Sequence, residues 1–75
     1  MTKIGLLIKE QRTKMGLSQD EAGHLVGVCG QFISNIERGF ALPPRKRLSL
    51  FVDKLKINEK RAKKAFETDY LEWLK

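Results

Sequence analysis

Residues 17–39 read LSQDEAGHLVGVCGQFISNIERG, and this stretch decides the fold. Ser18 followed three residues later by Glu21 is typical of a capping box, in which each side chain accepts a hydrogen bond from the other residue's backbone amide. The box predicts a short helix over residues 18–27, because the glycine at its end readily adopts the left-handed conformation that closes a helix. A second helix is predicted over residues 31–38, and another glycine follows it directly.

Two short helices joined only by residues 27–29 cannot lie side by side, because such a tight turn forces them to cross at a steep angle. This arrangement is a helix-turn-helix, and Gly23 supplies the small residue that the crossing requires. The residues expected to face inward are Val28, Ile33 and Ile36. The residues expected to face outward are Gln31, Ser34, Asn35 and Arg38. Amide, hydroxyl and guanidinium groups of this kind can hydrogen-bond to base edges and phosphates.

The remainder of the chain also shows helical spacing. The segments with apolar side chains at every third or fourth position are residues 2–15, 48–55 and 58–75. Thr2 and Asn58 are suitable N-caps, and Pro44 suits the first position of the fourth helix. No stretch alternates with a period of two, so the sequence predicts an all-α fold of five helices.

Length and charge limit the kinds of protein that this chain can be. Its 75 residues carry 15 Lys and Arg against 9 Asp and Glu, which gives a formal net charge of +6. One domain, residues 1–75, is expected, and 41% hydrophobic with 32% charged residues is typical of folded rather than disordered proteins. The excess of positive charge lies in residues 43–75, with ten basic and five acidic residues. It predicts an acidic partner, either nucleic acid or an anionic membrane surface.

Cysteine content and hydropathy indicate the compartment. The single Cys29 excludes an internal disulfide and is typical of a reducing environment. No apolar run approaches the roughly 20 residues that a membrane span needs, and the first residues lack the features of a secretory signal. We therefore expect a cytoplasmic protein.

Three short motifs resemble one known family. LSQ at residues 17–19, GV at 27–28 and ISNIERG at 33–39 are similar in type and spacing to the phage repressor and Cro helix-turn-helix family, also called Xre or Cro/C1-type. The resemblance covers about residues 4–55 and leaves residues 56–75 outside. It implies a compact, lambda-repressor-like DNA-binding domain of prokaryotic or phage origin. It also implies a sequence-specific transcriptional regulator, a repressor that occupies a double-stranded DNA operator. A homodimer formed through the C-terminal segment would bind a palindromic operator.

The resemblance implies roles for individual residues. The base-reading positions that match the family motif are Gly30, Gln31, Ser34 and Asn35. Gln31 is the leading candidate, because an extended amide can pair with both N6 and N7 of adenine. The positions implied for phosphates are Gln19, Arg38, Arg45 and Lys46, and the partly buried structural ion pair is that of Arg12 and Glu37. Gln19 is also expected to brace the first residues of the recognition helix.

Three residues depart from the family pattern. Gly23 replaces the usual Ala, which lowers helix propensity by roughly 1 kcal/mol. Gly30 lacks the long polar side chain of many relatives, so recognition is expected to rely on DNA shape or on a closer approach of the backbone to the groove floor. Cys29 stands at the N-cap, where Ser or Thr is common. Its thiol is either a redox-reactive group or a simple replacement for the hydroxyl cap.

The C-terminal segment carries a wide apolar stripe that has two interpretations. The stripe either completes the core of the same chain or forms a two-fold dimer contact. The candidates for a dimer contact are Phe66, Tyr70, Trp73 and Leu74. The basic residues on the same segment are Lys60, Arg61, Lys63 and Lys64. This basic cluster either attracts the duplex or is a solubilising helix face.

No catalytic, metal or cofactor site is indicated. His24 has no Cys, His or carboxylate at ligand spacing, and the chain has no Gly-rich phosphate loop. An enzyme, a membrane-spanning protein and a small-molecule receptor are therefore not expected. Two other functions stay open, an antitoxin-like module that holds a toxin with its C-terminal helix and a basic protein that coats nucleic acid or membranes without sequence preference. RNA binding is disfavoured, because the recognition helix lacks aromatic platforms for unpaired bases.

Overall fold

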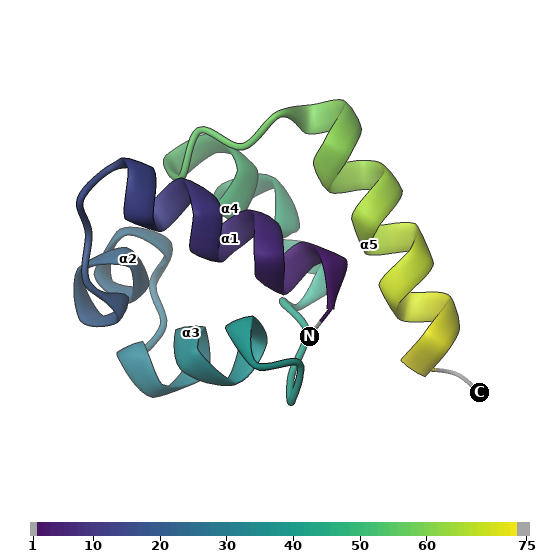
Figure 1. The fold of residues 1–75 in the computed structure, drawn as a ribbon, viewed down its shortest axis with the longest axis horizontal. Coiled ribbons are helices and arrows are strands. Elements are labelled where there is room, and N and C mark those ends of the chain that lie inside the picture. The colour runs from purple at the N-terminus through teal and green to yellow at the C-terminus, as the bar shows by residue number, and fades with distance from the viewer. Residues whose placement is uncertain (1, 74–75) are drawn as a thin grey trace.

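Five α-helices and one short 3-10 helix make up residues 2–73, the part of the chain that the computed structural model describes (Figure 1). Side chains are described for residues 2–71. The elements are α1 (Lys3–Lys14), α2 (Gln19–Val26), α3 (Gly30–Glu37), the 3-10 helix η1 (Arg45–Arg47), α4 (Leu48–Lys54) and α5 (Glu59–Trp73). No strand occurs among these residues, and the predicted all-α fold of five helices is confirmed.

The ends of α2 follow from three residues of its own sequence. Ser18 Oγ accepts a hydrogen bond from the Glu21 amide at 3.0 Å, and the Glu21 carboxylate accepts one from the Ser18 amide at 2.8 Å. These two contacts hold the pKa of the Glu21 carboxyl below its usual value. Gly27 ends the helix with a φ of 76°, a left-handed conformation that costs glycine little. The predicted capping box and glycine stop are confirmed.

The other helix ends agree with the prediction to within one turn. Thr2 caps α1 and Asn58 caps α5, each accepting a hydrogen bond of 3.0 Å from the amide three residues further on. The recognition helix α3 begins at Gly30, one residue before its predicted start. Residues 45–47 form η1, a tighter turn of the kind that often leads into an α-helix, so α4 itself begins at Leu48.

The core lies between α1, α2, α3 and α4, and α5 packs against α1 (Figure 1). Its fully buried apolar side chains are Ile4, Ile8, Ala22, Val26, Ile33, Ile36, Phe51 and Leu55. Ile33 and Ile36 therefore face inward as predicted, and Val28 is partly buried against the same cluster. Because the inner side of α3 is anchored in this core, the position of its outer side is determined as well.

The aromatic side chains of α5 pack largely against other parts of the same chain. Phe66 is only 7% exposed, and its ring centroid lies 4.1 Å from that of Tyr70. The Tyr70 hydroxyl donates a hydrogen bond to the Pro43 carbonyl at 2.5 Å, and burial raises the pKa of Tyr70 although nearby Arg45 opposes the rise. The expectation that Phe66 anchors a dimer is therefore wrong, because α5 lies against α1 and buries this ring. The Trp73 side chain and Leu74 lie outside the described residues.

A buried carboxylate joins the two ends of the chain. Asp69 on α5 is 1% exposed, and its two oxygens accept hydrogen bonds from the amides of Lys3 at 3.0 Å and Ile4 at 2.6 Å. These amides belong to the first turn of α1 and have no partner within their own helix. Sequence reasoning missed this contact, although Asp69 falls three residues after Phe66 on the apolar stripe. An acidic residue in a buried stripe was the available signal.

The α2–α3 crossing is closer than an alanine would allow. A Cβ atom added at Gly23 would lie 2.6 Å from the Val28 carbonyl oxygen and 3.1 Å from the Cys29 carbonyl carbon. Gly23→Ala is expected to lower the free energy of unfolding by about 1 kcal/mol, because the overpacking cost exceeds the gain in helix propensity. Urea unfolding measures this change, with His24→Ala as the matched control on an exposed position of the same helix. A more stable Gly23→Ala protein would show that the crossing relaxes to accept a methyl group.

Candidate nucleic-acid interface

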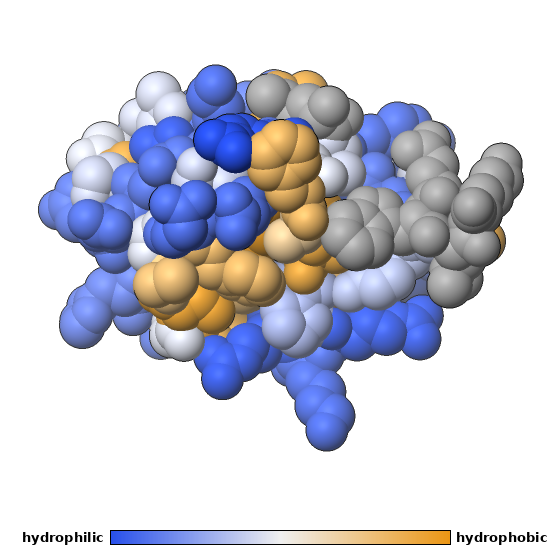
Figure 2. Space-filling model, turned by 90° about the horizontal axis from the view of Figure 1, so that it is seen from below, coloured by the Kyte–Doolittle hydropathy of each residue, from blue (hydrophilic) through white to orange (hydrophobic). Residues whose placement is uncertain are grey.

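The outer side of α3 presents three of the predicted base-reading residues together. Gln31 is exposed, and Ser34 and Asn35 are half-buried. Ile33 and Ile36, on the opposite face of the helix, point into the core. Gln31 Nε2 donates a hydrogen bond to Asn35 Oδ1 at 3.1 Å, which links the amides of two successive helical turns. The molecule seen from below, the side on which α3 lies in Figure 1, has hydrophilic side chains beside an apolar patch (Figure 2).

Gly30, the fourth predicted base-reading residue, does not lie on the outer side of α3. It is buried, and a Cβ atom added to it would overlap the carboxylate of Asp20 and lie 3.0 Å from the Asp20 Cα atom. The short turn places the first residue of α3 directly under the first turn of α2, so the glycine is needed for this close packing. Gly30 therefore does not face outward with Gln31, contrary to the sequence expectation that its backbone approaches the groove floor.

An ion pair holds the C-terminal end of α3 against α1. Arg12 Nε and Nη2 donate to the two oxygens of Glu37 at 2.7 and 3.0 Å, and Nη1 donates to the Leu17 carbonyl at 2.9 Å. Glu37 is only 3% exposed. The hydrogen bonds to Glu37 raise the pKa of Arg12, so the guanidinium stays charged at all ordinary pH values. The structure thus contains the ion pair that the resemblance implied.

Gln19 belongs to the same network. Its Nε2 donates to Glu37 Oε1 at 3.3 Å, so three donors from α1 and α2 converge on one carboxylate. Gln19 therefore braces the last residue of α3, whereas the resemblance implied that it braces the first residues. The recognition helix is held in place by side-chain contacts from both preceding helices.

Exposed cations follow α3 in the chain. Arg38, Arg45 and Lys46 are all exposed, and the guanidinium carbons of Arg38 and Arg45 lie 4.6 Å and 5.7 Å from the ring centroids of Phe40 and Tyr70. Exposed cations of this kind are suited to phosphate contacts.

Arg47 acts differently from its neighbours. Its Nη1 donates to the carbonyls of Gly27 at 3.2 Å and Val26 at 3.4 Å, so it satisfies the C-terminal end of α2. Sequence reasoning missed this role, because nothing in the run of residues 45–47 distinguishes the cation that caps a helix from the two that face solvent.

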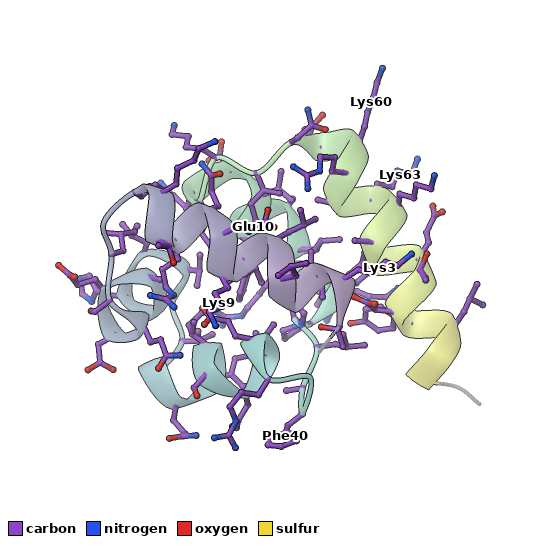
Figure 3. All side chains as sticks on the ribbon, in the orientation of Figure 1. Lys3, Lys9, Glu10, Phe40, Lys60 and Lys63 are labelled. Carbon is purple, nitrogen blue, oxygen red and sulfur yellow. The ribbon has the colours of Figure 1, made fainter. Side chains whose placement is uncertain are left out.

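The basic cluster of α5 lies away from this interface. Lys60 and Lys63 project from the top of the molecule in Figure 3, whereas α3 and Phe40 lie at the bottom. This placement favours a solubilising face over a contact with the same duplex. Cys29 has an exposed thiol that makes no capping hydrogen bond. No group of three potential metal ligands occurs in residues 2–71, and none of the described helices is long and apolar enough to cross a membrane.

Comparison with known proteins identifies the family. The helix-turn-helix family profile matches residues 8–60, more than half of the sequence. This chain belongs to the helix-turn-helix family. The matching profile is of the Cro/C1 type that the sequence motifs resemble, so the chain is a DNA-binding helix-turn-helix protein of the Cro/C1 kind.

Two kinds of relative agree with this assignment. The ImmF control region 10 kDa protein of Bacillus phage phi105 is 40% identical over 47 residues, which are 63% of this chain and 52% of that protein. The match thus spans about half the length of the phage relative. A point mutant of the restriction-modification controller protein C.Esp1396I has a TM-score of 0.70 and 28% identity, over 99% of this chain and 90% of that chain. The wild-type controller also scores 0.70 at 22% identity, over 95% and 92% of the two chains, a likeness of fold alone.

Proposed function

We propose that this helix-turn-helix protein binds a specific palindromic operator in double-stranded DNA as a homodimer and represses transcription by occupying it. One observation carries the proposal. On the polar side of α3, Gln31 is exposed and Ser34 and Asn35 are half-buried, while the opposite side is anchored in the core and the C-terminal end is held by Arg12. These three residues therefore form a pre-positioned candidate reading surface. A helix so presented fits the major groove of B-form DNA.

Gln31 is the base-reading residue with the best geometry. Its Nε2 carries two hydrogens, and the bond to Asn35 uses one of them. The other hydrogen and the amide oxygen are left for N7 and N6 of adenine. Asn35 thus orients the Gln31 amide before DNA is bound, which reduces the entropy lost on binding.

Phosphate contacts are assigned to the residues around α3. The proposed set is Gln19, Arg38, Arg45 and Lys46. Because such contacts are largely electrostatic, affinity is expected to fall as salt concentration rises. In a plot of log affinity against log salt concentration, each phosphate contact is expected to steepen the slope by about one unit.

The homodimer is proposed for the C-terminal end of α5. Leu71 is 64% exposed there, and a large apolar side chain on the surface favours association. Trp73 and Leu74 follow it in sequence and complete the proposed contact, whereas Phe66 is committed to the core. The repressor role is supported by the relatives, a phage control-region protein and a restriction-modification controller protein.

Selection of bound duplexes from a random pool tests this function. We expect a symmetric site with two half-sites about 10 base pairs apart. Gln31→Ala is expected to relax the preference at one position in each half-site, worth about 1–3 kcal/mol of base discrimination. Gln11→Ala, which removes an amide from α1, is the matched control and is expected to select the wild-type site.

Three results would contradict parts of the proposal. An unchanged preference for Gln31→Ala would remove this residue from base reading. A protein that sediments as a monomer at tens of micromolar and stays monomeric on DNA would contradict the homodimer. Equal affinity for selected and random duplexes would contradict sequence-specific regulation and favour a coating protein, and co-purification of a second small protein would favour an antitoxin-like module.

A further inference from the structure

Phe40 is an exposed aromatic residue directly after the recognition helix. Its side chain is 65% exposed, more than any other large apolar side chain among residues 2–71. It points away from the body of the protein beyond the C-terminal end of α3 (Figure 3). Single exposed apolar side chains are common on protein surfaces, so the case for a partner rests on the surroundings of this ring.

The backbone fixes where the Phe40 ring emerges. Gly39 has a φ of 85°, and its amide donates to the Ile36 carbonyl at 3.1 Å while the Phe40 amide donates to the Asn35 carbonyl at 2.8 Å. These bonds form a Schellman motif, in which the residue in the position of Phe40 usually packs its apolar side chain on the last turn of the helix. Here the last turn offers Ser34 and Asn35, which are polar, so the ring projects outward.

Arg38 completes the arrangement. Its guanidinium carbon lies 4.6 Å from the centroid of the Phe40 ring, a cation–π distance, so it covers one face of the ring and leaves the other face open. The ring therefore emerges beside a positive charge, from a backbone position that is hydrogen-bonded to the carbonyl of Asn35. The surface that Phe40 and Arg38 form is apolar and cationic, and it directly follows the proposed reading residues. It complements the edge of a DNA major groove, where thymine methyl groups lie near phosphates.

We propose that Phe40 contacts the C5-methyl group of a thymine where α3 leaves the major groove, while Arg38, held on the ring, binds the adjacent phosphate. The thymine methyl is the apolar group that base edges display in the major groove. A second copy of this chain is a poorer partner, because pairing two Phe40 rings would bring two Arg38 charges together. The inference rests on the proposed function and adds a specificity contact to it.

Replacement of thymine by deoxyuridine, which removes only the methyl group, tests the contact. Each thymine of the operator selected by the wild-type protein is replaced in turn, and affinity is measured. We expect one position per half-site at which wild-type affinity falls by about fourfold, the value of one buried methyl-sized group. Phe40→Ala is expected to lose at least this factor on the thymine duplex and to be insensitive to the replacement, and Phe40→Leu is expected to lie between.

The control is Leu25→Ala, which removes an exposed apolar side chain from α2 and is expected to keep the wild-type sensitivity. Because the Phe40 ring is outside the core, Phe40→Ala is expected to unfold at the wild-type temperature. The inference is overturned if no replacement affects the wild-type protein, or if Phe40→Ala stays as sensitive as wild type. It is also overturned if Phe40→Ala shifts the monomer–dimer equilibrium in sedimentation, since the ring then serves a second copy. Failure of the proposed function is distinct, because the pool then yields no preferred site at all.

Discussion

Arg12→Ala is expected to lower the free energy of unfolding by about 3–5 kcal/mol, because it strands a buried charge. Glu37 is 3% exposed and would keep only the hydrogen bond from Gln19. A chain of 75 residues is stable by about 4–11 kcal/mol in total, so the loss removes a large share of its stability. Urea unfolding followed by circular dichroism measures the change.

The chain supplies its own control for this prediction. Arg61 and Glu10 form a second ion pair at 3.8 Å, but both side chains are exposed. Arg61→Ala is therefore expected to cost less than about 1 kcal/mol. Replacing both Arg12 and Glu37 with Leu is expected to cost less than Arg12→Ala alone, since no charge is then stranded. Equal losses for Arg12→Ala and Arg61→Ala would contradict the buried network.

Asp69→Ala is expected to cost about 3 kcal/mol, because hydrogen bonds to a charged acceptor are strong and two amides, one of them buried, lose their partner. The amides of Lys3 and Ile4 would be left without an acceptor in the first turn of α1. Urea unfolding measures the total loss, and amide hydrogen exchange at these two residues measures the local loss. The N-terminal turn of α1 is expected to exchange faster even where the variant stays folded.

Two further variants define the source of the Asp69 effect. Asp69→Asn keeps one acceptor oxygen and is expected to lose about half as much stability as Asp69→Ala. Glu67→Ala removes an exposed carboxylate from the same helix and is expected to change stability by less than about 0.5 kcal/mol. If Asp69→Ala were as mild as Glu67→Ala, the carboxylate would not be what joins α5 to α1.

Arg12→Ala and Asp69→Ala both remove a contact of α1, the helix against which α3 is held. Asp69 anchors the start of α1 to α5, and Arg12 near its end anchors α3 through Glu37. The reading surface of α3 thus depends on two polar contacts that lie outside it. Loss of DNA binding in these variants is expected to follow their loss of folding, whereas Gln31→Ala is expected to lose specificity in a folded protein.

The helix ends and the faces of the recognition helix were predictable from sequence. Ser18, Glu21, Gly27 and Asn58 act on backbone groups within four residues, so their roles follow from local spacing. The inward direction of Ile33 and Ile36 and the outward direction of Gln31 follow from the helical period alone. Such signals need no knowledge of where the other helices lie.

Only the tertiary structure decided the rest. It buried Gly30 under Asp20, placed Phe66 in the core, used Arg47 as a helix cap, and paired Asp69 with amides 65 and 66 residues away. Each outcome depends on how separate helices pack together, and that packing is a property of the whole core. A residue's type states what it can bind, and only the arrangement of the helices determines which partner comes within reach.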